Sequence, residues 1–136
     1  MAHTQPPGGR RAALIVDDDE RVRSTLARIL RWLGAWQRLE TAADGAEALA
    51  LAAELRPDLV LVDLWLPDGM GLDLLPALRA LAPGCHIVVI TAEEAPELHA
   101  RALAAGADGY LLKTMPPDAL LAALRALAAG GESLDR

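Results

Sequence analysis

The most constraining feature of the sequence is a run of four apolar residues, Leu59–Val62, that leads directly into Asp63. Two of the four are β-branched, and Pro67 follows with an Asp-Gly pair that is typical of a turn. A short apolar run without alternation is typical of a strand buried on both faces, as in a parallel sheet. The pattern therefore predicts a central strand that delivers the Asp63 carboxylate to a loop at its carboxyl end.

Further segments show a strand pattern, and they alternate with segments of helical periodicity. The predicted strands besides 59–62 cover residues 12–16, 36–42, 86–91 and 109–113, and the predicted helices cover residues 20–33, 46–55, 71–81, 96–105 and 117–129. Segment 36–42 alternates only weakly, which favours an edge strand. Strands that alternate with helices form a parallel sheet with right-handed crossovers. The predicted fold class is therefore α/β, a doubly wound five-stranded parallel sheet with helices on both faces.

Capping and breaking residues mark the ends of the predicted helices. Asp19 is available as an N-cap for the first helix, and Gly34 ends it. Pro76 would interrupt the third helix, so we place it in or near the first turn, where a missing N–H is tolerated. We predict His99, on the fourth helix, to be a surface residue, and Gly130–Gly131 to end the last helix.

Length and composition limit the classes of protein to which this chain can belong. The 136 residues predict one domain at 12–129, with a flexible leader at 1–11 and the start of a linker or tail at 130–136. No apolar run approaches the roughly 18 residues that a membrane helix needs. A net charge of −6 argues against non-specific binding to nucleic acid or anionic membranes. A single cysteine, Cys85, suits a reducing compartment, so we predict a cytoplasmic protein.

Polar side chains follow or end four of the predicted strands. They are Asp17, Asp18 and Asp19 after the first strand, Asp63 after the third, and Thr91 and Lys113 at the ends of the last two. Ligands of a doubly wound sheet bind outside the carboxyl ends of its strands, where the strand order reverses, so we expect these groups to converge. Each has an ordinary explanation by itself, as a helix cap, a strand-end residue or a solvated lysine. It is their expected convergence that favours a functional site.

The predicted convergence has a chemical consequence. Carboxylates gathered at one edge repel one another unless a cation joins them, and Mg²⁺ is typically bound through one or two carboxylates together with water and phosphate oxygens. We expect Asp18 and Asp63 to ligate Mg²⁺ directly and Asp17 to act mainly through an ordered water. With the Lys113 ammonium and the Thr91 hydroxyl facing the same point, the set is typical of phosphoryl transfer.

The same motifs resemble the CheY-like receiver domain of bacterial response regulators in two-component signalling. The resemblance rests on Val16-Asp17-Asp18, the stretch from Asp63 to Pro67, Thr91-Ala92, and the stretch from Tyr110 to Lys113, and it covers about residues 12–129. It implies a flavodoxin-like strand order of 2-1-3-4-5. It also implies that Asp63 accepts a phosphoryl group from a sensor histidine kinase.

The resemblance implies roles for the other members of the predicted site. Asp17, Asp18 and Asp63 would hold Mg²⁺ with the backbone carbonyl of Trp65. Thr91 and Lys113 would contact the phosphoryl oxygens, and Tyr110 would follow Thr91 as a switch residue. The segment 106–131 resembles the NarL/FixJ class, whose members usually carry a DNA-binding helix-turn-helix beyond the receiver. Regulation of transcription would then require a DNA-binding domain absent from this chain, with homodimerisation on phosphorylation as a further possibility.

Some features leave alternatives open. Trp65 is a bulky residue for a position two places after the predicted acceptor Asp63, and we expect it to shield an aspartyl phosphate from water. The dipeptide Thr114-Met115 separates Lys113 from the next proline, as in NarL-like members. The resemblance implies a phosphoacceptor protein that assists its own phosphoryl transfer and dephosphorylation, so we do not expect an enzyme. The alternatives are a stand-alone receiver, an unphosphorylated interaction module and, with less support, a small phosphohydrolase using Asp17 and Asp19.

Overall fold

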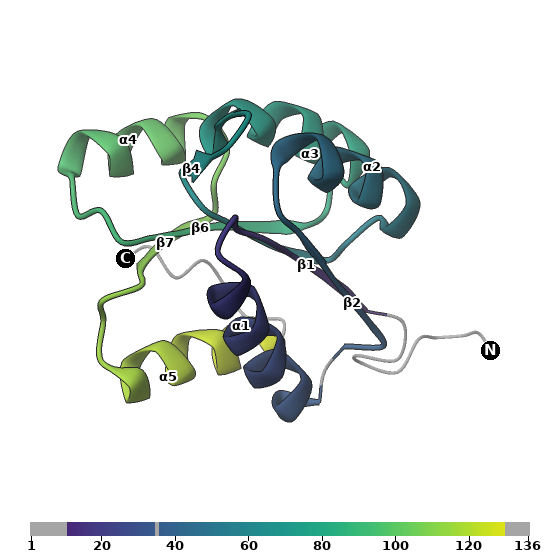
Figure 1. Ribbon diagram of the computed structural model, residues 1–136, viewed down its shortest axis with the longest axis vertical. Coiled ribbons are helices and arrows are strands. Elements are labelled where there is room, and N and C mark those ends of the chain that lie inside the picture. Colours follow the sequence, from purple (N-terminus) through teal and green to yellow (C-terminus); the bar gives the residue numbers. More distant parts are fainter. Residues whose placement is uncertain (1–10, 35, 130–136) are drawn as a thin grey trace.

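The computed structural model describes residues 11–34 and 36–129, and its centre is a five-stranded parallel sheet (Figure 1). The strands lie in the order β2-β1-β3-β6-β7. Their bounds are β1 Ala12–Val16, β2 Arg38–Ala42, β3 Leu59–Val62, β6 His86–Thr91 and β7 Gly109–Leu112. Counted among the sheet strands alone, this is the predicted order 2-1-3-4-5, and the predicted edge position of the second strand is confirmed.

Within these described residues, five α-helices cover the sheet, two on one face and three on the other (Figure 1). Their bounds are α1 Glu20–Leu33, α2 Gly45–Leu55, α3 Leu75–Leu81, α4 Pro96–Ala104 and α5 Pro117–Ala128. Leu14 and Val16 of β1 pack toward α2, α3 and α4, while Ala13 and Ile15 pack toward α1 and α5. Successive side chains of a strand point to opposite faces, so a sheet covered on both faces needs an uninterrupted apolar run. This is why the central strands show no polar alternation.

The predicted capping signals of the first helix are confirmed. The Asp19 side chain accepts a hydrogen bond from the Arg21 N–H, and Gly34 ends α1 in the left-handed region with φ at 75°. Pro76 lies in the first turn of α3, as predicted. Of the predicted termini, residues 1–10 and 130–136, which include Gly130–Gly131, lie outside the described residues.

Two predicted boundaries were wrong by more than one residue, whereas α2, α4, β7 and α5 each differ from the prediction by one residue at one end. Strand β2 begins at Arg38 rather than at residue 36, because the N–H groups of Gln37 and Arg38 both point at the Arg11 carbonyl. The third helix begins as a 3₁₀ turn, η1 Gly71–Leu74, and becomes α-helical only at Leu75. Pro76 has no N–H to donate to the Leu72 carbonyl, which accepts from Leu75 instead, so the tighter turn replaces the first α-helical turn.

The loop after β3 contains a small hairpin that the sequence did not predict. Strands β4 Trp65–Leu66 and β5 Gly69–Met70 pair antiparallel, and Gly69 has a φ of 146°. The hairpin fixes the main chain immediately after Asp63. No helix within the described ranges combines the length and apolar character needed to cross a membrane.

Candidate functional site

The site is built on backbone hydrogen bonds that extend the sheet past the ends of its strands. The Asp17 N–H donates to the Ala42 carbonyl at 3.0 Å, and the Asp63 N–H donates to the Val16 carbonyl at 3.0 Å. The Lys113 N–H donates to the Thr91 carbonyl at 2.7 Å. The main chain of each of these predicted site residues is therefore held by the neighbouring strand.

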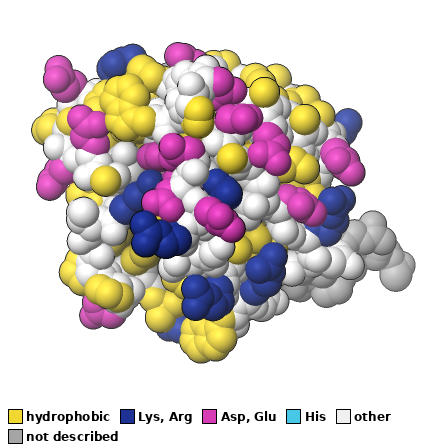
Figure 2. Space-filling view, viewed as in Figure 1, with side chains coloured by type: hydrophobic (Ala, Val, Ile, Leu, Met, Phe, Trp, Pro, Cys, Tyr) yellow, Lys and Arg dark blue, Asp and Glu magenta, His cyan; other side chains and the backbone are white. Residues whose placement is uncertain are grey.

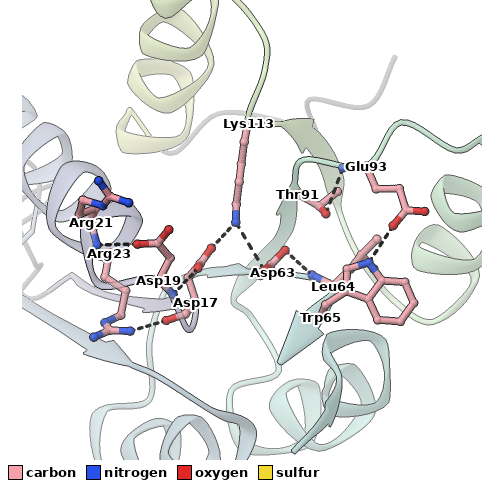
Figure 3. A network of polar contacts seen from close by, with 10 residues as sticks. All are labelled: Asp17, Asp19, Arg21, Arg23, Asp63, Leu64, Trp65, Thr91, Glu93 and Lys113. Atoms are coloured by element: carbon pink, nitrogen blue, oxygen red, sulfur yellow. Dashed lines mark hydrogen bonds and ion pairs between the residues drawn. The ribbon is translucent and has the colours of Figure 1, made fainter. Parts of the chain in front are cut away.

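The two buried carboxylates share one cation. Lys113 Nζ lies 2.5 Å from Asp17 Oδ2 and 3.4 Å from Asp63 Oδ2 (Figure 3). Asp17 is 1% exposed and Asp63 is 7% exposed. The predicted convergence of Asp17, Asp63 and Lys113 is thus observed.

The pKa values of Asp63 and Lys113 are shifted by burial and by the charges close to them. Burial raises the pKa of Asp63 above its ordinary value; Lys113 opposes the rise and the Asp17 carboxylate adds to it. For Lys113, burial lowers the pKa, but the nearby Asp17 and Asp63 carboxylates outweigh that effect and the net shift is upward. The ammonium therefore stays charged, while burial makes the ionised form of Asp63 less favourable.

Three carboxylates at the edge have the arrangement that a hard cation needs. Asp17, Asp18 and Asp63 each offer an oxygen atom, and these atoms all lie within 4.8 Å of one another. The Asp17 Oδ1 atom accepts the Asp19 N–H, and the Asp63 Oδ1 atom accepts the Leu64 N–H. Within the described part of the chain, the buried Asp17 Oδ2 atom accepts no hydrogen bond and has only the ionic contact with Lys113. The donor set therefore fits Mg²⁺; the Trp65 carbonyl stays a predicted ligand.

Thr91 and Tyr110, the predicted switch residues, are connected through a residue that the sequence did not single out. The Thr91 side chain is buried, and its Oγ1 accepts the Glu93 N–H at 3.4 Å. The Tyr110 hydroxyl donates to the Glu93 carbonyl at 2.8 Å. Trp65 Nε1 donates to Glu93 Oε1 at 2.7 Å (Figure 3).

His99, which we predicted to be a surface residue, is partly exposed on α4 and makes a ring contact that the sequence did not predict. Its ring is half-buried and stacks on the Tyr110 ring, with centroids 4.7 Å apart and an angle of 14° between the planes. Burial raises the pKa of Tyr110, and the nearby Glu93 adds to the rise. The phenol of Tyr110 is therefore neutral and can act as a hydrogen-bond donor.

A glycine makes the loop at Asp63 possible. The Gly71 N–H donates to the Leu64 carbonyl at 2.6 Å, and a Cβ atom on Gly71 would lie 2.0 Å from the Asp63 carbonyl oxygen. No side chain fits at that position. A glycine after a turn gives no such signal in a single sequence, so this requirement was not predicted.

Comparison with known proteins places this geometry among receiver domains. A family model described as the response regulator receiver domain matches residues 13–125. The chain is 40% identical over 114 residues to "Probable transcriptional regulatory protein TcrX" of Mycobacterium tuberculosis, which corresponds to 84% of this chain and 48% of that protein. The chain spans about half the length of the curated relatives it matches.

Two solved structures extend the comparison. A response regulator from Burkholderia pseudomallei, with a phosphorylated aspartic acid, calcium ion and citrate, is 34% identical with a TM-score of 0.76, covering 88% of this chain and 69% of the other. The signal receiver domain of the putative response regulator NarL from Mycobacterium tuberculosis is 29% identical with a TM-score of 0.78, covering 89% of this chain and 98% of the other. These likenesses agree with the predicted CheY-like and NarL-like character of the fold.

Proposed function

Because this chain belongs to the response regulator receiver domain family, we propose that it accepts a phosphoryl group on Asp63 and alters its surface in response. Receiver domains of response regulators interact with histidine kinases, and we propose a sensor histidine kinase as the phosphoryl donor. The placement of the Asp63 carboxylate supports this role most directly. It lies at the carboxyl end of the central strand β3, beside a lysine and two further carboxylates, where a nucleophile, a cation and a metal can meet.

The transfer can be written for the groups present. An Asp63 carboxylate oxygen attacks phosphorus, the phosphorus–nitrogen bond of the phosphohistidine breaks, and its electron pair stays on the imidazole nitrogen, which then takes up a proton. Lys113 would neutralise charge on the phosphoryl oxygens, and the Thr91 hydroxyl would donate to another. Mg²⁺ held by Asp17, Asp18, Asp63 and the Trp65 carbonyl would supply further neutralisation of the transferred group. The protein would act as acceptor rather than enzyme.

The signal would leave through Thr91 and Tyr110. A Thr91 hydroxyl drawn toward the phosphoryl group would vacate space for the Tyr110 ring and shift the packing of α4 against β7. Coupling between two sites is typically about 1–3 kcal/mol, which shifts a population without creating a new fold. Sedimentation with and without a phosphoryl mimic would test homodimerisation; an unchanged mass in both would contradict it.

We propose that the domain regulates transcription through a DNA-binding domain that is absent from this chain. The name of the relative TcrX, and the coverage of about half of that protein, support this output. The net charge of −6 makes direct DNA binding by the receiver itself unfavourable. A cytoplasmic location is proposed on the same grounds of family and composition.

The phosphohydrolase alternative has less support. It required Asp19 to work beside Asp17, but the Asp19 carboxylate caps α1 by accepting the Arg21 N–H at 2.9 Å. An unphosphorylated interaction module would not need the carboxylate cluster.

Mass spectrometry after incubation with acetyl phosphate and Mg²⁺ tests the proposal. The wild-type protein should gain one phosphoryl group, and Asp63→Ala should gain none. Asp73→Ala, which removes an exposed carboxylate of η1, is the matched control and should behave as wild type. Chelation of Mg²⁺ should suppress the modification. Modification that persists in Asp63→Ala would contradict the assignment, and continuous release of phosphate from a general monoester would favour the hydrolase.

A further inference from the structure

Glu93 joins three separate parts of the site. Its carboxylate accepts Trp65 Nε1–H from the hairpin after β3, and its carbonyl accepts the Tyr110 hydroxyl from β7. Its own N–H points at Thr91 Oγ1 at the end of β6. One residue of the loop between β6 and α4 is thereby connected to the loop that carries Asp63 and to both predicted switch residues. Figure 3 shows its bonds to Trp65 and Thr91.

The bond between Trp65 and Glu93 has the character of a reversible contact. The Trp65 side chain is 48% exposed, and Glu93 is exposed as well. Hydrogen bonds in contact with water contribute little net free energy, so such a bond can be made and broken without unfolding the domain. Figure 2 shows acidic side chains (magenta) over the upper part of the face in view, with Lys and Arg side chains (dark blue) among and below them. A further negative charge at Asp63 would add to the carboxylates of Asp17 and Asp18 beside it.

We infer that Trp65 and Glu93 form a latch that holds the β6–α4 loop and Tyr110 in the arrangement seen here until Asp63 is phosphorylated. Glu93 is a positioning residue, because it acts through Trp65, Thr91 and Tyr110. The inference rests on the proposed role of Asp63.

Two effects of phosphorylation oppose the latch. The phosphoryl group adds roughly one negative charge in place of the carboxylate, and this charge repels the Glu93 carboxylate that Trp65 holds beside the loop after Asp63. The Thr91 hydroxyl, once drawn to a phosphoryl oxygen, also ceases to accept the Glu93 N–H in its present geometry. Because coupling is reciprocal, removing the latch should make the phosphorylated arrangement easier to reach.

The hydrogen bond itself can be followed by the indole N–H signal of Trp65 in proton–nitrogen NMR, assigned by its loss in Trp65→Phe. In Glu93→Ala this signal should move upfield, as for an indole that donates to water. Glu94→Ala is the matched control, since it removes the same charge from the neighbouring exposed position of the same loop. A Trp65 signal that is unchanged in Glu93→Ala would overturn the latch.

The coupling can be measured as the equilibrium affinity for beryllofluoride, a non-covalent phosphoryl mimic, in saturating Mg²⁺. We expect Trp65→Phe and Glu93→Ala each to tighten binding about 2- to 10-fold, the range equivalent to one net hydrogen bond. The double variant should bind no more tightly than the stronger single variant. Glu94→Ala should match wild type, and circular dichroism should verify the fold of every variant.

The outcomes separate the latch from simpler causes. Tightening in Glu93→Ala but not in Trp65→Phe would mean that only the charge of Glu93 matters, and fully additive effects would mean that the two side chains act independently; either result overturns the latch. Failure of the wild-type protein to bind beryllofluoride would overturn the proposed function and this inference with it.

Discussion

At the scale of single residues, Trp65 has a second property besides its hydrogen bond, which is its bulk. It follows Asp63 by two positions and leaves about half of its surface in water (48% exposed). We predict that Trp65→Asn shortens the lifetime of the aspartyl phosphate, because a smaller polar side chain admits water to the phosphorus. Autodephosphorylation should become roughly 10-fold faster, equivalent to about 1.4 kcal/mol of barrier. Trp65→Phe keeps the bulk and should retain most of the lifetime; an unchanged rate in Trp65→Asn would refute shielding.

Gly71 makes the sharpest steric prediction. A methyl group there would lie 2.0 Å from the Asp63 carbonyl oxygen, and the two nearest opposing atoms belong to backbone that cannot rotate away. Gly71→Ala should therefore destabilise the domain by at least about 2 kcal/mol, within the upper range for overpacking, and should displace Asp63. Urea unfolding and phosphorylation by acetyl phosphate would measure both effects. Gly84→Ala is the control, because a methyl group at that position would meet no atom of the described residues within 4 Å beyond its chain neighbours; stability losses that match in both variants would contradict the steric explanation.

The residues of the site divide by whether their position in the sequence carries a signal. Asp17, Asp63 and Lys113 could be predicted because each directly follows an apolar strand, and parallel strands bring their carboxyl ends together. Glu93 could not, because an exposed acid in a loop is typical of any surface. The stacking of His99 on Tyr110 was missed for a related reason: a contact between a helix and a strand depends on side-chain directions that a single sequence does not encode.

At the scale of elements, Asp68 connects the hairpin after Asp63 to the start of α2. Its carboxylate oxygens accept the N–H groups of Gly45 at 2.8 Å and Ala46 at 3.0 Å. These hydrogen bonds lower the pKa of Asp68, and the bond from the Gly45 N–H makes the largest contribution. Since the folded pKa lies below the ordinary value of 3.8, the stabilisation is present above that value and is lost as the pH falls through the lowered one.

We predict that Asp68→Ala lowers the melting temperature at neutral pH and speeds hydrogen exchange at the Gly45 and Ala46 amides, because two N–H groups at a helix start lose their acceptors. The difference from wild type should shrink in acid. Asp73→Ala removes another carboxylate from the following turn and should leave those amides protected. Equal exchange rates in Asp68→Ala and wild type would contradict the capping role.

Helices and strands were predicted where they are long enough for the spacing of their apolar residues to show a helical or strand pattern. Helix α1 has an N-cap, an apolar face and a terminal glycine, so its bounds match the prediction. The hairpin β4–β5 has two residues in each strand, too few for any periodicity, and only its turn could be anticipated. The cap from Asp68 to Gly45 joins residues 23 positions apart, which local sequence rules do not reach.

At the scale of the whole molecule, the buried carboxylate of Asp63, which the proposed function requires, lowers the stability of the fold. The pKa of Asp63 is raised by burial in spite of Lys113, so the folded protein holds this proton more tightly than the unfolded chain does. Stability therefore falls as the pH rises from the ordinary value of 3.8 to the raised one, and it stays reduced at neutral pH. The proposed phosphoacceptor is therefore a group whose ionised form lowers the stability of the fold.

Replacing that carboxylate by a neutral group of the same shape should reverse the loss. We predict that Asp63→Asn is more stable than wild type by about 1–2 kcal/mol at neutral pH, a typical size for a single substitution, because the remaining Asp17 carboxylate then has Lys113 to itself. The gain should shrink as the pH falls toward the ordinary value of 3.8, where wild-type Asp63 becomes protonated in both states. Saturating Mg²⁺ should stabilise the wild type more than the variant and narrow the gap, since a bound ligand stabilises only the state that binds it. Thermal unfolding across pH with and without Mg²⁺ would measure all three effects, and an Asp63→Asn variant less stable than wild type at neutral pH would show that the ion pair with Lys113 outweighs the burial of the charge.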